Sequence, residues 1–126
     1  MEISEKCLKK RLRVWKALSN LFLDTELDQT DYGYIAKEII ESEFSRSEVQ
    51  DILWKEVFPA LADNLRIVAG EWGGFSEDWL QNRILSVMNG SEKGPGFLGL
   101  MTVRQTRKVI DETWNEVQKQ LSNENQ

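Results

Sequence analysis

Apolar residues recur every three or four positions through several stretches of the chain, which is the period of a helix with one buried face. The first stretch spans residues 3–22, and its apolar positions are Ile3, Cys7, Leu8, Leu12, Trp15, Leu18, Leu21 and Phe22. Its opposite side holds Lys6, Lys9, Lys10, Arg13 and Lys16. A basic helix face can bind nucleic acid, but it is more often only solvated, and we expect a solvated face here.

A second helix is predicted over residues 32–41, after a turn rich in carboxylates. Thr30 or Asp31 is suited to cap its first turn, because short polar side chains accept hydrogen bonds from the first backbone N–H groups of a helix. The positions expected to face the core are Tyr32, Ile35, Ala36, Ile39 and Ile40.

The start of a third helix carries the clearest local signal in the sequence. Ser45 and Glu48 have the spacing of a capping box, and Phe44 and Val49 flank them as a hydrophobic staple. The helix should kink at Pro59, or break there and restart at Ala60, because proline lacks an N–H group and clashes with the preceding turn.

Helical spacing returns over residues 61–68 and stops at the glycines within residues 70–74. Phe75 and Ser76 then repeat the staple and cap ahead of a helix over residues 77–88. This part of the chain therefore predicts two more helical segments.

The last part of the chain is predicted to be a glycine-rich loop, residues 89–100, and then a final helix. Thr102 and Gln105 have capping-box spacing. The stripe of the last helix consists of Val103, Thr106, Ile110, Thr113, Trp114, Val117 and Leu121. Residues 122–126 should fray. We thus predict an all-α fold, a compact helical bundle of about five to six helices that forms a single domain over residues 1–126.

Length and composition agree with one small domain. The chain has 126 residues, 40% of them hydrophobic, and only two prolines, which suits one helical core. No run of 18 to 20 apolar residues is present and the first residues lack the pattern of a secretion signal, so we expect a cytoplasmic protein without membrane contact. The single cysteine, Cys7, cannot form an internal disulfide, in agreement with a reducing compartment.

The absence of histidine argues against catalysis, because histidine is the commonest general base and the usual partner of a serine or cysteine nucleophile. Acidic pairs at i, i+3 spacing, Glu38 with Glu41 and Glu48 with Asp51, leave magnesium-dependent chemistry as the alternative. No second motif supports it, so we expect no enzyme activity and no cofactor.

A calcium loop is also excluded, although the acidic run that begins at Asp24 resembles the start of one. An EF-hand requires glycine at its sixth position and glutamate at its twelfth, where this chain has Gln29 and Ile35. The glycines at residues 70–74 and 94–96 match no nucleotide-binding pattern. We therefore expect no metal site.

Charge is distributed unevenly along the chain. Residues 1–22 carry six Lys or Arg against two Glu, residues 23–56 carry three against ten acidic residues, and the remainder carries seven against nine. An acidic surface repels nucleic acid and accelerates encounter with a basic protein, although acidic charge also simply improves solubility. The predicted partner-binding residues are the carboxylates of this middle third, namely Asp24, Glu26, Asp28, Asp31, Glu38, Glu41, Glu48 and Asp51.

Three stretches, Val14–Leu27, Ile52–Leu61 and Val68–Phe75, resemble a family of small bacterial proteins of unknown function. The resemblance covers roughly residues 11–85 and leaves out the glycine-rich loop and the last helix. It implies a bacterial origin and a helical fold, and it supplies no catalytic motif.

Small acidic bacterial proteins without catalytic residues are similar in type to immunity proteins, which neutralise toxins that are often basic nucleases. We therefore expect a protein that binds a basic toxin domain and binds neither nucleic acid nor membrane. The alternative is a helical adaptor or regulator of another cytosolic protein.

Overall fold

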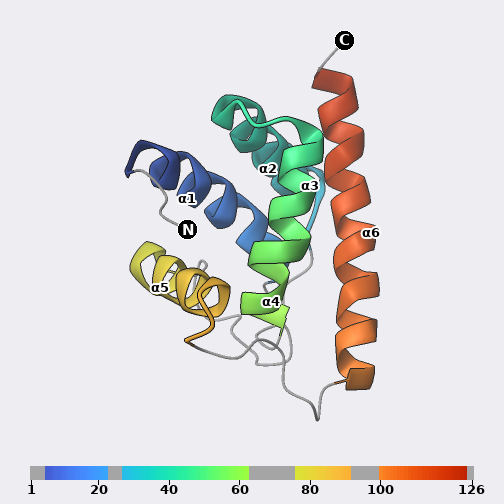
Figure 1. Ribbon diagram of the computed structural model, residues 1–126. Coiled ribbons are helices and arrows are strands. Elements are labelled where there is room, and N and C mark those ends of the chain that lie inside the picture. Colours follow the sequence, from blue (N-terminus) through green and yellow to red (C-terminus); the bar gives the residue numbers. More distant parts are fainter. Residues whose placement is uncertain (1–4, 23–26, 63–75, 92–99, 125–126) are drawn as a thin grey trace.

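The computed structural model describes residues 5–22, 27–62, 76–91 and 100–124, and every regular element among them is helical (Figure 1). The all-α fold is confirmed. The α-helices are α1 (Glu5–Ser19), α2 (Gln29–Ser42), α3 (Arg46–Ile52), α4 (Phe58–Leu61), α5 (Glu77–Met88) and α6 (Leu100–Glu124). A 3-10 turn, Asn20–Phe22, extends α1, and a π-helical turn, Leu53–Val57, joins α3 to α4.

The α1 helix lies at the centre of the packing, in contact with α2, α5 and the π-helical turn. Its buried positions are Val14, Trp15, Ala17, Leu18 and Ser19. Trp15 and Leu18 are fully buried, as the three-to-four spacing of the stripe requires. The first predicted helix is therefore confirmed.

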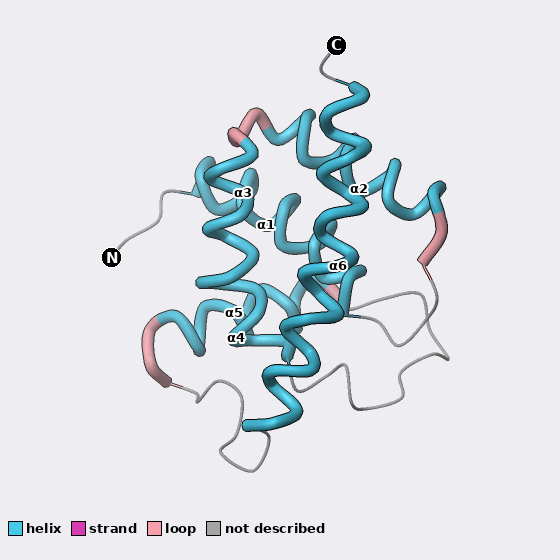
Figure 2. Tube along the Cα trace, turned by 90° about the vertical axis from the view of Figure 1, so that its right-hand side faces the viewer, coloured by secondary structure: helices cyan, strands magenta, loops and turns pink. Residues whose placement is uncertain are grey.

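The longest helix, α6, runs along one side of the molecule beside α2 and α3 (Figures 1 and 2). Its buried positions are Ile110, Trp114, Val117 and Leu121, all on the predicted stripe. The Nε1 of Trp114 donates to the Oε1 of Gln50 at 3.5 Å, which links the middle of α6 to α3. The core is thus shared by segments from both ends of the chain.

Two predicted helix caps, Ser45 and Ser76, are confirmed. The Oγ of Ser45 accepts from the backbone N–H of Glu48 at 3.1 Å, and a Glu48 oxygen accepts from the Ser45 N–H at 2.9 Å. Ser76 accepts from the N–H of Trp79 at 3.2 Å. The short polar side chains replace hydrogen bonds that the first helical turn cannot make within itself.

The predicted cap of α2 was wrong, because the helix begins earlier than Thr30. Asp28 is the N-cap. Its Oδ1 accepts from the N–H of Asp31 at 3.0 Å, and the Oδ2 of Asp31 accepts from the N–H of Asp28 at 2.9 Å. Asp31 therefore takes part in the cap from the third helical position, which single-residue cap preferences do not reveal.

Pro59 neither ends nor breaks the helical path, which continues from Arg46 through Leu61. The N–H of Phe58 bonds to the carbonyl of Leu53, five residues back. A π-helical turn widens the helix by one residue, so that proline, which lacks a donor, can lie in the first turn of α4.

The remaining predictions differ from the structure or fall on residues that it does not describe. Ile40, expected in the core, is 39% exposed. The last helix begins at Leu100, ahead of the predicted cap at Thr102, and continues to Glu124, into the segment expected to fray. Of the helix predicted over residues 61–68, the structure describes only the first two residues. Phe75 and most of the glycine-rich loop also lie outside the described residues.

Replacing Ser45 with alanine should lower the free energy of unfolding by about 1 kcal/mol, because the first turn of α3 loses the acceptor for one N–H group. Urea titration followed by circular dichroism measures this change. Ser47→Ala is the matched control, since Ser47 is an exposed serine in the same turn. Equal stabilities of the two variants would contradict the assignment of the cap.

The capping box should also make stability depend on pH. The hydrogen bond from the Ser45 backbone N–H lowers the pKa of Glu48 from its ordinary value of 4.5. The stabilisation is therefore complete above that ordinary value and is lost as pH falls through the lower pKa of the folded protein. The stability difference between wild type and Glu48→Gln should shrink on acidification over this range, whereas a difference independent of pH would refute the effect.

Candidate functional site

The acidic residues of the middle third do not form one uniform surface. Asp28 and Asp31 lie at the start of α2, where the carboxylate of each accepts a hydrogen bond from the backbone N–H of the other. Neither forms an ion pair with a described residue. Asp24 and Glu26, predicted to belong to the same turn, lie outside the described residues.

Glu38 and Glu41, on α2, are held by one arginine of α1. The Nε of Arg13 donates to Glu38 at 3.0 Å, and its Nη2 donates to Glu38 at 3.4 Å and to Glu41 at 3.0 Å. These contacts raise the pKa of Arg13, chiefly through the hydrogen bond to Glu38. The two carboxylates are therefore already paired within the protein.

Two lysines of the same α1 face also have acidic partners. Lys10 approaches Glu43 at 3.5 Å, and Lys16 contacts Glu77, the first residue of α5, at 2.9 Å. The hydrogen bond to Glu77 is the main reason why the pKa of Lys16 is raised. The basic face that we expected to be only solvated thus joins α1 to its neighbours, although each exposed pair contributes little to stability by itself.

Glu48 and Asp51, at the start and end of α3, are both exposed. Glu48 accepts the Ser45 N–H and forms no ion pair with a described residue. Asp51 pairs with Lys55 one turn later at 3.8 Å, and the side chains of Lys55 and Asp51 are 75% and 66% exposed. A contact of this length between solvated groups neutralises the carboxylate only weakly.

A carboxylate that the sequence analysis did not single out is the most enclosed one described. Glu56, in the π-helical turn, accepts the Nε and Nη2 of Arg11 at 3.2 and 3.0 Å and the Nε1 of Trp15 at 2.8 Å. Its hydrogen bond raises the pKa of Arg11. Arg11 also lies over the ring of Phe44, 5.7 Å from its centroid.

Sequence contained a signal for this cluster. Arg11 and Trp15 are one turn apart on α1, and Glu56 lies one turn after the buried Ile52, so all three fall beside core positions. A carboxylate next to the core must be paired or hydrogen-bonded. Because these three groups satisfy one another, the cluster fixes α1 against the π-helical turn and leaves little capacity for an external ligand.

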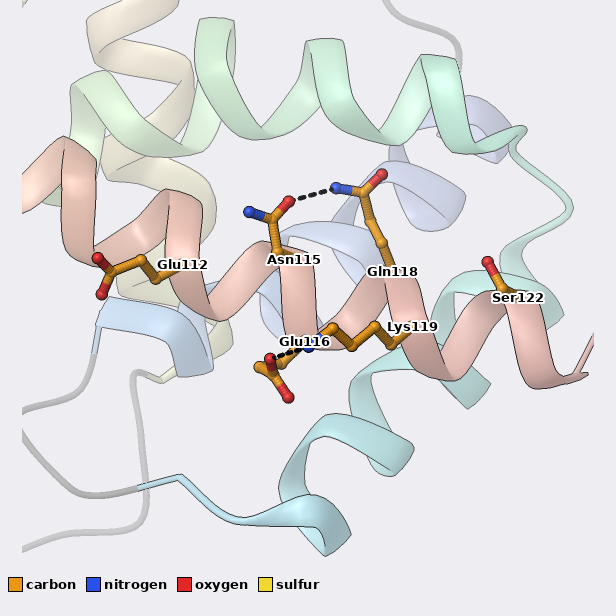
Figure 3. Close-up of a pocket in the computed structure, with 6 residues that line it drawn as sticks. All are labelled: Glu112, Asn115, Glu116, Gln118, Lys119 and Ser122. Carbon is orange, nitrogen blue, oxygen red and sulfur yellow. Dashed lines mark hydrogen bonds and ion pairs between the residues drawn. The ribbon is translucent and has the colours of Figure 1, made fainter.

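The surface depressions differ in how many of their polar side chains already bond to one another. Figure 3 shows one on α6 whose six lining residues come from that helix alone: Glu112, Asn115, Glu116, Gln118, Lys119 and Ser122. Gln118 donates to Asn115 at 3.1 Å, and Lys119 pairs with Glu116 at 2.8 Å. This open and polar depression offers no apolar anchor.

A second depression, of about 220 Å³, lies between α1, α2 and α5. Leu12 and the half-exposed ring of Tyr34 supply its apolar part, and the paired Arg13 and Lys16 line it as well. A third, of about 260 Å³, lies between the end of α2, the start of α3 and Leu121 of α6. These two combine apolar and charged groups, as protein-binding surfaces do.

Within the described part of the chain, no group of three or more Cys, Asp or Glu side chains is arranged to hold a metal ion. The helices that the structure describes include none long and apolar enough to cross a membrane.

The chain belongs to the family defined as a domain of unknown function (DUF7079), whose family model matches residues 9–120. This match includes the glycine-rich loop and most of α6, so the family extends well beyond the residues 11–85 on which the sequence resemblance rested. No curated protein and no solved structure matches the chain.

Replacing Glu56 with glutamine should lower the free energy of unfolding by about 1 to 3 kcal/mol, because Arg11 would lose its counter-charge in a largely buried position. The control is Glu112→Gln, an exposed glutamate on α6, which should change stability by less than about 0.5 kcal/mol. Chemical denaturation measures both values. Equal stabilities would show that the cluster does not hold α1 in place.

Proposed function

We propose that the protein is a non-catalytic, protein-binding protein of the bacterial cytoplasm, an immunity protein that neutralises a cognate toxin by forming a tight complex. The partner is a basic toxin domain. The observation that carries the proposal is a set of carboxylates that the fold leaves without strong counter-charges, namely the exposed Asp28, Glu48 and Asp51 and the partly exposed Asp31.

The spacing of these carboxylates favours a macromolecular partner. Asp28 precedes α2 and Glu48 follows it, so the two groups are separated by a helix of 14 residues, which is about 20 Å long. A small ligand could not contact both ends, whereas a protein interface of ordinary size extends that far. A basic surface would meet several of these charges during one encounter, which raises the association rate.

The acidic pair Glu38 and Glu41 supports the non-catalytic part of the proposal. Both carboxylates contact Arg13, so a magnesium ion would have to displace an arginine that lies between them. The proposal therefore places these two residues at the edge of the partner surface rather than in a metal site. Calorimetry with magnesium, manganese and calcium should accordingly detect no stoichiometric binding at millimolar metal, and a saturable site would overturn this part.

Protection of cells tests the proposal directly. Expression of the chain should rescue bacteria from a toxin encoded beside its gene, and the two purified proteins should form a one-to-one complex. Failure to protect, together with a stable complex with some other cytosolic protein, would favour the alternative function of an adaptor or regulator.

The contribution of the acidic surface can be measured without disturbing the helix caps. Asn and Gln retain the capping hydrogen bonds of Asp and Glu, so Asp28→Asn, Glu48→Gln and Asp51→Asn together remove three charges and keep the caps. At low salt this variant should associate with the toxin about tenfold more slowly and with a weaker salt dependence, as stopped-flow fluorescence would show.

The matched control combines Asp78→Asn, Asp111→Asn and Glu112→Gln, which removes the same charge from exposed positions of α5 and α6. It should retain most of the wild-type association rate. If both triple variants slow association equally, net charge alone is responsible and the surface lies elsewhere.

A further inference from the structure

The groove between α2 and the C-terminal part of α6 has an apolar interior and charged edges. Its volume is about 260 Å³. Ile39 and Leu121 are buried and Ile40 and Phe44 are partly exposed, while Glu43 and Arg46 supply the charges. The groove therefore has room for one large apolar side chain from outside the protein.

Ile40 is the most exposed apolar residue of this groove. The helical period places it next to the core, yet it remains 39% exposed. A single exposed apolar residue is ordinary on a protein surface. Ile40 differs because it lines a concave surface together with Phe44, whose ring also lies under the guanidinium of Arg11. That contact, at 5.7 Å from the ring centroid, supports the ring from one side.

Glu43, at the edge of the groove, has a backbone conformation that favours glycine. It ends α2 in the left-handed region with φ of 69°, where it is the only residue other than glycine with positive φ in the described part of the chain. Glycine is preferred at this position because a Cβ atom is disfavoured there. The sequence therefore retains a glutamate where glycine would fit the backbone better.

The Glu43 carboxylate contributes little to the stability of the fold. Its side chain is 77% exposed, and its described ion pair is the 3.5 Å contact with Lys10. A solvated pair of this kind contributes little to stability. The left-handed conformation itself ends α2, where the Glu43 N–H bonds to the carbonyl of Ile40. The choice of glutamate at this position is what lacks a structural reason, and that is a reason to look for a function.

Charges around the groove indicate which partner suits it. Glu43 is the acidic residue that lines it, while Glu41, which is paired with Arg13, and Glu48 lie on the flanking helices. Arg46 is turned towards the end of α6, where its Nη2 donates to the Oγ of Ser122 at 2.9 Å. A cation can therefore approach from the Glu43 side, away from the arginine, where it would share or replace the 3.5 Å contact of Lys10.

We propose that this groove receives a large apolar side chain of a basic protein partner, and that Glu43 pairs with a lysine or arginine adjacent to it. The partner is a protein segment in which an apolar residue neighbours a basic one. The inference rests on the proposed function for the basic character of the partner, and it adds an apolar anchor to a surface otherwise defined by charge. Buried anchors of this kind dominate the energy of most protein interfaces.

Nuclear magnetic resonance with small peptides tests the groove without the toxin. Acetyl-Leu-Lys-amide, titrated at millimolar concentrations into the isotope-labelled protein, should shift the backbone amide signals of Ile40, Glu43 and Phe44. Acetyl-Ala-Lys-amide lacks the apolar anchor and acetyl-Leu-Glu-amide reverses the charge, so both should cause shifts several-fold smaller. Absent shifts in the groove, or equal shifts from all three peptides, would overturn the proposal.

Two pairs of variants assign the effect to individual side chains. Ile40→Ser should weaken the peptide-induced shifts several-fold, while Val109→Ser, which changes an exposed apolar residue of α6 outside the groove, should leave them unchanged. Glu43→Gln should weaken them and Glu112→Gln should not. Undiminished shifts in Ile40→Ser or Glu43→Gln would contradict the assigned roles.

Replacement of Glu43 with glycine separates binding from folding. This variant should raise Tm by a few degrees because the backbone strain is relieved, and it should nevertheless weaken the peptide-induced shifts. A lower Tm would show that Glu43 serves the fold instead. The outcomes are independent of the protection assay: peptide binding without protection removes the immunity function alone, and protection without peptide binding removes the groove alone.

Discussion

The fold depends on the need to satisfy one carboxylate beside the core. Glu56 lies in the π-helical turn and receives hydrogen bonds from both Arg11 and Trp15 of α1, so it sets how α1 lies against the α3–α4 segment. With α1 in that position, its outer cations come within reach of α2 and α5. The exposed pairs of Arg13 and Lys16 thus follow from a contact that is itself largely buried.

This arrangement changes the meaning of the charge pattern in the sequence. Segment charges suggest a basic N-terminal helix and a separate acidic middle, yet Arg13 bonds to both Glu38 and Glu41. Among the described carboxylates of that middle segment, those without an arginine partner lie at the ends of α2 and on α3. Local net charge therefore describes the surface correctly only when elements that are distant in sequence do not neutralise each other.

The sequence predicted most of the helices and their buried faces, because those depend on the periodicity of residues such as Trp15 and Trp114 and on local caps such as Ser45. It failed where the outcome depends on neighbours. The double role of Asp31 in its cap, the passage through Pro59 and the exposure of Ile40 each depend on hydrogen bonding or packing that single-residue preferences do not contain. The pairing of the acidic site residues was hidden for the same reason.

The π-helical turn holds one residue more than an α-helical turn. Val49 and Ile52 before it and Phe58 and Leu61 after it all face the core. Loss of a single residue within the turn would leave an ordinary α-helix in which the same residues still face the core, because the widened turn absorbs the extra residue within itself. In that ordinary helix, however, the ring of Pro59 would clash with the carbonyl group four residues earlier. The extra residue therefore accommodates the proline rather than the register of the core.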